Sequence, residues 1–282
     1  MLQFPWTDQF ISVNGIRTRF VQAGAGPDII LVHGLGGSCE QWCKNIDYLA
    51  RSHRVVCFDL PGHGKSGKPR DTAYSLEWLS RFLGDFAAGM GCGKFSLMGL
   101  SLGGGACLRY TLDNPATVDR IVLTAAAALG PRLGLPLRLA ASIPFAARVN
   151  FAPPRSLYAI YVRSIVHAPE NDVRDFLDFY YSAVRNPEIR ATFFRALRTN
   201  CNLMGLKKAV RDDITGRLDR LSPPALIVWG RQDSFMPVSN AREALKKIPH
   251  ARLVLIDDCG HNPQFEKYRE FNGIVGEFLG GK

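Results

Sequence analysis

The sequence predicts an α/β protein with a doubly wound, mostly parallel sheet and an inserted helical lid. Short apolar runs alternate with longer amphipathic stretches, as strands and helices alternate in such a sheet. The alternation stops between residues 125 and 223, where helical spacing and aromatic residues dominate. A Gly-x-Ser-x-Gly run directly follows one of the apolar runs. At 282 residues, the chain is long enough for one large domain that carries an insertion.

Several short runs have the length and composition of strands. A hairpin is expected around Asn14-Gly15, because Asn-Gly suits a two-residue turn between antiparallel strands. Buried parallel strands are expected where Val, Ile, Leu and Phe cluster between turn residues. The hairpin strands cover residues 10–13 and 17–21, and the parallel strands cover residues 29–32, 54–58, 95–98, 121–123, 225–229 and 252–256. Helical spacing appears over residues 76–90 and 238–248.

The predicted domain organisation is a sheet-containing core, residues 1–124 and 224–282, interrupted by a helical lid, residues 125–223. Pro153-Pro154 and Pro223-Pro224 mark breaks in this lid. The lid is rich in Arg, Tyr and Phe. We expect most of its aromatic side chains to form the core of the lid and a minority to line a substrate pocket.

The composition excludes several classes of protein. Lys and Arg number 35 against 25 Asp and Glu, a net charge of +10, but they form no block of five or six. A solvated basic surface is therefore expected, with no nucleic-acid partner. The seven Cys show no zinc-ligand spacing, so they are expected to be small buried side chains in a reducing compartment, with no metal and no cofactor.

The sequence predicts a soluble, cytoplasmic protein. Residues 1–10 lack the basic start and the continuous apolar stretch of an export signal. The most apolar region, residues 125–149, is interrupted by proline and arginine and has no run of about 20 apolar residues. Stable membrane insertion is not expected. The sequence leaves the oligomeric state open.

Ser101 is the candidate nucleophile. It is the middle residue of Gly99-Leu100-Ser101-Leu102-Gly103, between a predicted strand and a helix expected to begin near Gly104. A sharp strand-to-helix turn exposes the central hydroxyl, and flanking glycines are needed where a Cβ would clash. The N-terminus of the helix then favours the negative charge that develops in the reaction.

His261 is the candidate general base, since a serine hydroxyl needs a base within hydrogen-bond reach. It follows the last predicted strand, and the carboxyl ends of parallel strands share one edge of a sheet. His261 and the turn at Ser101 can therefore meet. His53 precedes a strand and His250 lies at the opposite end of the last strand, so both are expected at the surface.

Asp233 is the candidate acid that orients His261. It follows the predicted strand 225–229, at the same edge of the sheet. The other suitable position follows the strand 121–123, but residues 124–128 contain no carboxylate. Asp257 and Asp258 are too close to His261 along the chain to be better candidates.

An oxyanion formed during attack requires two backbone N–H donors. Leu102, the residue after the nucleophile, is expected to supply one. The other is expected from the loop at residues 33–37, which reads His-Gly-Leu-Gly-Gly. Leu35 is the preferred donor there and Gly36 is the next choice.

Taken together, these motifs resemble the α/β-hydrolase family. The resemblance rests on the His-Gly-x-Gly-Gly loop, the run at residues 59–66, the Gly-x-Ser-x-Gly turn, the Trp-Gly-x-x-Asp strand end and the Gly-His loop. It covers the chain from about residue 10 onward, except for the lid, which varies in this family. The resemblance implies a catalytic triad of Ser101, Asp233 and His261, in the expected chain order, with oxyanion donors at Leu35 and Leu102. It implies structural roles for His33 and for residues 59–66.

Two nucleotide-binding motifs are incomplete. Gly64-Lys65-Ser66 resembles the end of a Walker phosphate loop, but the required first glycine is Asp59. Residues 34–36 resemble the start of a dinucleotide fingerprint, but its third glycine position is Cys39.

The predicted activity is hydrolysis of a small-molecule carboxylic ester through an acyl-enzyme on Ser101. Serine at this position argues against the epoxide hydrolase and haloalkane dehalogenase branches, where the resemblance would require Asp. The alternative is a C–C bond hydrolase acting on ring-fission products of aromatic degradation. That branch typically has Asn where this chain has Leu100, and its acidic substrate would be held by lid arginines such as Arg155, Arg163 and Arg174. A non-catalytic ligand receptor on the same fold is the third hypothesis.

Overall fold

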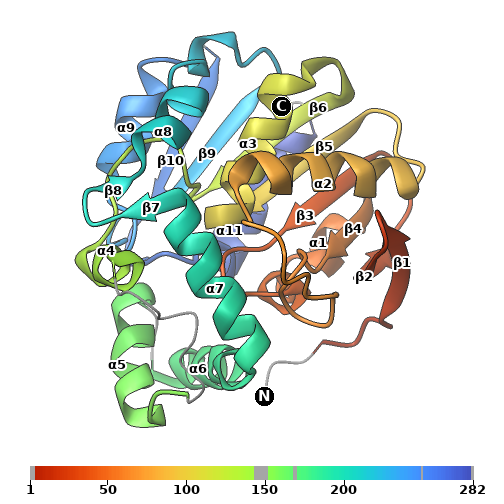
Figure 1. Cartoon of the computed structure of the whole chain (residues 1–282). Helices are drawn as coiled ribbons and strands as arrows, with labels where there is room; N and C mark the ends of the chain where they lie inside the picture. The colour runs from red at the N-terminus through yellow and green to blue at the C-terminus, as the bar shows by residue number, and fades with distance from the viewer. Residues whose placement is uncertain (1–3, 143–151, 168–169, 249, 281–282) are drawn as a thin grey trace.

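The fold is centred on one large twisted sheet, as the computed structural model shows for residues 4–142, 152–167, 170–248 and 250–280 (Figure 1). Eight strands lie in the order β1-β2-β4-β3-β5-β6-β9-β10. β2 pairs antiparallel with β1 and β4, and the other neighbours are parallel. The strands are β1 (Gln9–Val13), β2 (Ile16–Ala23), β3 (Asp28–Val32), β4 (Arg54–Phe58), β5 (Phe95–Leu100), β6 (Val118–Thr124), β9 (Ala225–Gly230) and β10 (Ala251–Ile256). The predicted mostly parallel sheet is confirmed.

Helices cover both faces of the sheet. α2 and α3 pack against each other over one face, and α1 and α11 pack against each other over the other (Figure 1). The core helices are α1 (Ile46–Leu49), α2 (Leu76–Gly89), α3 (Ser101–Asp113), α9 (Ser239–Leu245), α10 (Pro263–Glu266) and α11 (Tyr268–Leu279). Short 3₁₀ turns occur at η1 (Cys39–Trp42), η2 (Pro115–Thr117) and η4 (Leu218–Arg220).

α2 illustrates why these segments fold as they do. Ser75 caps the helix by accepting a hydrogen bond from the backbone N–H of Trp78 at 3.1 Å. Its apolar residues recur at helical spacing and are buried against the sheet: Leu79, Phe82, Leu83 and Phe86. The helix ends at Gly89, one residue before the predicted boundary, while α9 ends at Leu245, three residues before its predicted boundary.

A second group of elements lies between β6 and β9, and we call these residues the insertion. It is mainly helical, as predicted, but also contains a two-stranded hairpin that the sequence did not indicate. Its elements are α4 (Leu135–Ser142), α5 (Arg155–Ile165), α6 (Glu170–Arg185), α7 (Pro187–Asn200), β7 (Cys201–Asn202), β8 (Gly205–Leu206) and α8 (Lys208–Thr215). α4 to α7 lie beyond one end of the sheet, below it in Figure 1.

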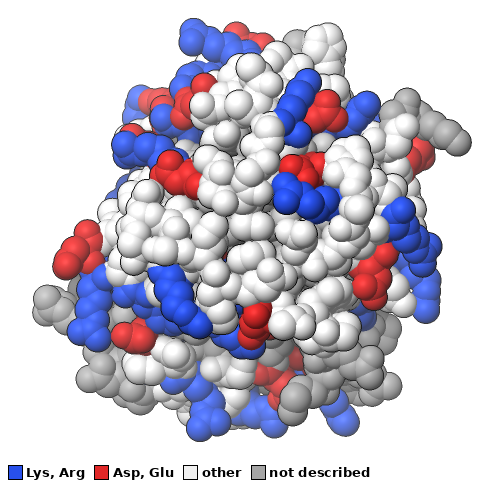
Figure 2. All heavy atoms as spheres, turned by 90° about the vertical axis from the view of Figure 1, so that its right-hand side faces the viewer, with Lys and Arg blue, Asp and Glu red and all other residues white. Residues whose placement is uncertain are grey.

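The surface carries charges of both signs. On the face turned to the viewer in Figure 2, Lys and Arg are interspersed with Asp and Glu. Within the described residues, no helix combines the length and the apolar character required to span a bilayer.

Candidate active site

Ser101 occupies a strained turn between a strand and a helix. β5 ends at Leu100 and α3 begins at Ser101, three residues earlier than expected from the sequence. The φ angle of Ser101 is +52°, in the left-handed region that side chains rarely adopt. A Cβ at Gly99 would lie 2.6 Å from Cα of Gly104, and a Cβ at Gly103 would lie 2.3 Å from the carbonyl oxygen of His33. The turn therefore requires glycine on both sides of Ser101.

The hydroxyl of Ser101 faces a cavity. Its side chain is largely buried, and Oγ lies 4.0 Å from Sδ of Met236. His261 lines the same cavity. Among the described residues, the structure records no hydrogen bond between Ser101 and His261. Such bonds in ligand-free enzymes often form fully only when substrate is bound.

Asp233 and His261 form a buried pair. Oδ2 of Asp233 accepts a hydrogen bond from Nδ1 of His261 at 2.8 Å, which leaves Nε2 of the imidazole available. Oδ1 of Asp233 accepts hydrogen bonds from the backbone N–H groups of Phe235 at 2.9 Å and Met236 at 2.8 Å. The two residues meet because β9 and β10 are parallel neighbours and each residue lies on the loop after its strand.

The neighbouring carboxylates do not approach His261 in this way. Asp257 forms an exposed ion pair with Arg231, and Asp258 is exposed. Asp233 is therefore the carboxylate that the fold brings to the predicted base.

The predicted oxyanion donors differ in their placement. Leu35 and Leu102 both line the cavity with Ser101. Gly36 is not among the residues that line it. Its φ is +74°, and a Cβ there would lie 3.3 Å from the ring of Phe193. Of the two candidates in this loop, Leu35 is therefore the one that lies at the cavity wall.

Gln41 links the predicted oxyanion loop to the insertion, a role that the sequence did not indicate. Its Oε1 accepts a hydrogen bond from the backbone N–H of Gly34 at 2.8 Å. Its Nε2 donates to the hydroxyl of Tyr180 on α6. Gln41 is buried and also lines the cavity. It therefore holds the loop that carries Leu35 against the helical part of the wall.

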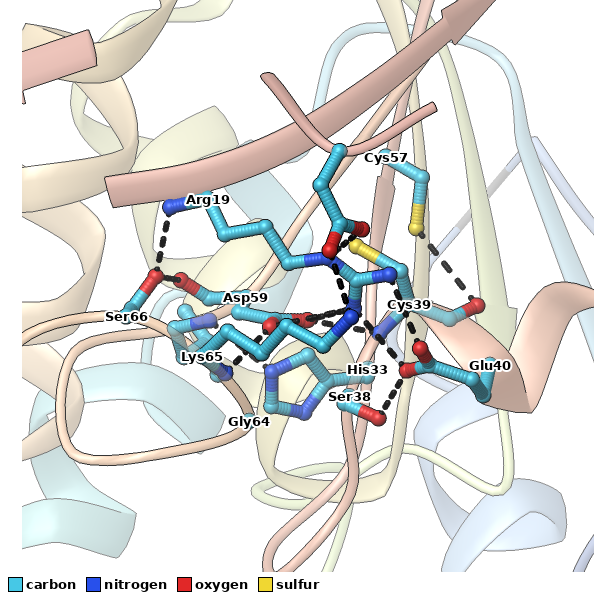
Figure 3. A network of polar contacts seen from close by, with 12 residues as sticks. Arg19, His33, Ser38, Cys39, Glu40, Cys57, Asp59, Gly64, Lys65 and Ser66 are labelled. Carbon is cyan, nitrogen blue, oxygen red and sulfur yellow. Dashed lines mark hydrogen bonds and ion pairs between the residues drawn. The ribbon is translucent and has the colours of Figure 1, made fainter. Parts of the chain in front are cut away.

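A buried ionic network lies behind the same loop (Figure 3). Arg19 forms ion pairs with Asp59 at 3.2 Å, Glu40 at 2.8 Å and Asp8 at 2.6 Å. Asp59 also accepts hydrogen bonds at 2.8 Å from the backbone N–H groups of Cys39 and Lys65. Several donors thus compensate the cost of burying Asp59, and β2, η1 and the loop after β4 are joined.

His33 and His63 are buried and neutral. His33 donates from Nδ1 to the carbonyl oxygen of Gly34 at 2.7 Å, and its Nε2 accepts from the N–H of Leu60 at 2.8 Å. Burial lowers the pKa of His33 to about 4 and the pKa of His63 to about 3. His33 thereby connects the loop after β3 with the loop after β4, whereas the recorded hydrogen bond of His63 is local, from Nδ1 to the carbonyl oxygen of Pro61 at 3.0 Å. Neither side chain lines the cavity.

Glu266 organises the loop that carries His261. Its carboxylate accepts hydrogen bonds from the backbone N–H groups of Gly260 and Asn262, both at 2.9 Å, and of His167 at 2.6 Å. Burial raises the pKa of Glu266, whereas these three donors and the nearby His261 oppose that rise. The sequence signal for this role was slight: a carboxylate five residues after the candidate base, on α10.

The insertion takes part directly in this arrangement. The backbone N–H of His261 donates to the carbonyl oxygen of Ile165, at the end of α5, at 2.9 Å. With the bond from His167 to Glu266, this contact joins two insertion residues to the loop of the candidate base.

The cavity above Ser101 has a volume of about 810 Å³, counting its open mouth. Core and insertion both contribute to its wall. None of the described residues that line it is Lys, Arg, Asp or Glu. The insertion supplies mainly apolar side chains to the wall, including Leu133, Leu137, Ile165, Phe193, Ala196, Leu197 and Leu206. Among the described residues, no three His, Cys, Asp or Glu side chains gather to hold a metal ion.

The arginines considered for an acidic substrate lie elsewhere. Arg155, Arg163 and Arg174 are exposed, and none lines the cavity. Arg155 forms an ion pair with Asp178. The abundance of arginine on the insertion therefore does not by itself place a cation at the cavity.

Known proteins resemble this chain along nearly its whole length. An uncharacterized protein of Mycobacterium tuberculosis is 30% identical over 98% of this chain and 82% of its own length. A 2-hydroxy-6-oxononadienedioate/2-hydroxy-6-oxononatrienedioate hydrolase of Cupriavidus pinatubonensis is 26% identical over 97% of this chain and 96% of its own. The solved structure of a 2-hydroxy-6-oxo-6-phenylhexa-2,4-dienoate hydrolase from Rhodococcus superposes with a TM-score of 0.82 at 23% identity, covering 97% of this chain and 98% of that one.

Residues 27–268 match the family described as the alpha/beta hydrolase fold. This match includes all three residues of the predicted triad and the loop at residues 33–37. With the eight-stranded sheet and the serine turn after β5, it establishes that the chain belongs to the α/β-hydrolase family.

Proposed function

We propose that this α/β hydrolase is a serine esterase that cleaves uncharged carboxylic esters through an acyl-enzyme on Ser101. The observation that carries the proposal is the cavity at Ser101, whose described wall is mostly apolar and contains no charged side chain. Such a wall binds the neutral hydrocarbon part of a substrate and offers no cation to a carboxylate.

In the first half of the reaction, Oγ of Ser101 attacks the ester carbonyl carbon while Nε2 of His261 takes the hydroxyl proton. Asp233 holds the imidazole through Nδ1 and stabilises its positive charge. The N–H groups of Leu35 and Leu102 stabilise the negative oxygen of the tetrahedral intermediate. When this intermediate collapses, the bond from carbon to the alkoxy oxygen breaks, and His261 donates its proton to the departing alcohol.

Water completes the cycle. His261 removes a proton from the water molecule as its oxygen attacks the acyl carbon, and a second tetrahedral intermediate forms under the same two N–H groups. The bond to Oγ of Ser101 then breaks, Oγ regains a proton from His261, and the carboxylic acid leaves. The enzyme returns to its starting protonation state with no cofactor.

The rival function is C–C bond hydrolysis of a ring-fission acid. The name of the 26% identical Cupriavidus relative supports it. Against it, the described cavity wall contains no Arg or Lys to pair with a substrate carboxylate. An acid bound there would be desolvated without a counter-charge.

Specificity constants distinguish these functions. Neutral p-nitrophenyl esters from acetate to dodecanoate should be compared with a ring-fission dienone acid. We expect the esters to be preferred and kcat/KM to rise about fourfold for each methylene group that the cavity buries. It should fall once the acyl chain exceeds the cavity. Because Arg155, Arg163 and Arg174 are exposed, changing each to Ala should leave the ester preference intact.

A dienone acid preferred over every ester by about a hundredfold would contradict the esterase proposal. Loss of that preference in one of the three arginine variants would place the acid site on the insertion. A receptor would behave differently again, because it would release at most one equivalent of product and show no sustained turnover.

A further inference from the structure

The insertion exposes more large apolar side chains than the rest of the described chain. Seven such side chains are exposed among the described residues, and all but Phe10 belong to the insertion. The six are Leu135, Leu139, Leu157, Ile160, Leu203 and Met204. Single exposed apolar residues are ordinary, whereas a contiguous group marks an interaction surface.

Four of these side chains form one surface, which we call the α4 patch: Leu135, Leu139, Leu203 and Met204. Leu135 and Leu139 are four residues apart on α4 and so lie on the same side of the helix. Leu203 and Met204 form the turn between β7 and β8. The two parts are joined because Nε of Arg138 donates to the carbonyl oxygen of Leu203 at 2.5 Å. Figure 1 shows α4 beside β7 and β8.

The elements that carry the α4 patch also form part of the cavity wall. On α4, Leu137 is 5% exposed and lines the cavity, while Leu135 is 59% exposed. On the hairpin, Cys201 and Leu206 line the cavity, while Met204 is 81% exposed. α4 and the hairpin are therefore apolar on both sides. The cavity accounts for the apolar side chains on the inner side, but not for those on the outer side.

In the two chain segments that carry the α4 patch, every charged side chain is positive. Residues 131–142 and 201–208 contain Arg132, Arg138, Lys207 and Lys208 and no Asp or Glu. Two of these cations interact with carboxylates of neighbouring elements: Lys208 forms an ion pair with Asp212, and Arg132 interacts electrostatically with Glu243. The face in Figure 2 differs, because there both signs are interspersed.

We propose that the α4 patch docks on a lipid bilayer containing anionic lipid, with its apolar side chains in the interface and its cations against the headgroups. An apolar surface bordered by Lys and Arg is the arrangement that binds such membranes peripherally. Binding would place the outer side of the cavity wall at the bilayer. The docking does not depend on which bond the enzyme cleaves.

Co-sedimentation with lipid vesicles tests the proposal. The protein should carry Ser101→Ala so that lipid is not consumed. Vesicles of phosphatidylcholine alone are compared with vesicles of equal parts phosphatidylcholine and phosphatidylglycerol. We expect binding to the mixed vesicles that weakens at high salt, since the Debye length shrinks from about 10 Å at 0.1 M to about 3 Å at 1 M.

Two kinds of variant separate the apolar and the charged contributions to vesicle binding. Met204→Ser should weaken binding to the mixed vesicles about tenfold, because its apolar side chain no longer enters the interface. Phe10→Ser on β1 is the matched control and should bind as strongly as the parent. Arg132→Gln and Lys208→Gln should each weaken binding about fivefold. All four positions are exposed, so we expect the substitutions to leave the fold intact.

Three outcomes would overturn the proposal: no binding to mixed vesicles, equal binding to both vesicle types, or unchanged binding of Met204→Ser. Sedimentation velocity without lipid tests the alternative that the α4 patch binds a second copy of this chain. If the protein did not bind vesicles but formed a dimer that Met204→Ser dissociated, the α4 patch would be assigned to a contact with a second copy of this chain.

Discussion

Glu266 holds the backbone on both sides of His261. Its Oε2 accepts from the N–H of Gly260 and its Oε1 from the N–H of Asn262, both at 2.9 Å. A single buried carboxylate thus fixes the peptide groups that flank the candidate base. Among the described residues, no hydrogen bond joins this carboxylate to the imidazole of His261.

Replacing Glu266 by Gln tests this positioning role. One of the N–H groups would face an amide NH₂ instead of an oxygen, and a buried unpaired donor costs about 1–3 kcal/mol. We expect the free energy of unfolding to fall by that amount and kcat to fall about tenfold, with little change in KM. Urea unfolding and ester kinetics measure the two effects. Glu270→Gln, exposed on α11, is the matched control and should change neither.

Ser101→Ala should lower kcat by at least about 10³-fold without changing the unfolding temperature, because the hydroxyl contributes to chemistry and not to packing. A fluorophosphonate probe followed by peptide mass spectrometry should find its adduct on Ser101. Ser234, exposed beside Asp233, provides the control substitution Ser234→Ala. Near-normal ester hydrolysis by pure Ser101→Ala protein would refute the assignment of the nucleophile.

Asp233→Asn should lower kcat by about 10³–10⁴-fold, because the amide favours the wrong imidazole tautomer and cannot stabilise the imidazolium. Asp257→Asn and Asp258→Asn should be mild, since both side chains are exposed. Ester kinetics of the three purified variants measure this difference. If either of the latter two proved more damaging, the orienting acid would lie on the loop after β10.

Gln41 and Tyr180 connect the predicted oxyanion loop with α6, so substitutions at both should affect kcat more than KM. Gln41→Leu leaves the N–H of Gly34 without its acceptor, and we expect kcat to fall about tenfold as the loop shifts. Tyr180→Phe should have a smaller effect of the same kind. Its matched control is Tyr181→Phe, whose hydroxyl donates instead to the carbonyl oxygen of Pro153. Equal kcat values for Gln41→Leu and the parent would show that the loop holds its position unaided.

Stability should depend on pH through His33 and His63. Burial lowers their folded pKa values to about 4 and about 3, so the unfolded chain, with histidine pKa near 6.5, binds protons more readily. The free energy of unfolding should therefore fall as pH drops below about 6.5, by up to about 1.4 kcal/mol per pH unit for each histidine. Their contribution is fully present above that pH.

Urea unfolding at pH values between about 7.5 and 5.5 measures this slope. His63→Gln should reduce it by up to about 1.4 kcal/mol per pH unit. His250→Gln, an exposed control, should leave it unchanged. An unaltered slope in His63→Gln would mean that this side chain takes up protons equally in both states.

The sequence could predict those parts of the site that follow from the local pattern of apolar strands and from the topology of a parallel sheet. Ser101, Asp233 and His261 each follow an apolar strand, and parallel strands bring their loops to one edge whatever the surrounding helices do. The role of Gln41 could not be predicted, because its partner Tyr180 is contributed by the insertion from a distant sequence position. Glu266 left only a slight signal, because its partners are backbone N–H groups, which have no sequence signature. The β7–β8 hairpin was also missed, since two-residue strands have no detectable periodicity.

The bond from the N–H of His261 to the carbonyl oxygen of Ile165 has a consequence for engineering. It makes the end of α5 part of the scaffold of the base, so the insertion is not an interchangeable cap. A chimera that replaced the whole insertion with a foreign one would alter reactivity together with selectivity. Grafts that keep residues 165–167 and exchange α7 would change the cavity wall while leaving this support in place. Any opening motion of the wall must likewise pivot around these residues, because swinging them outward would release the loop that carries His261.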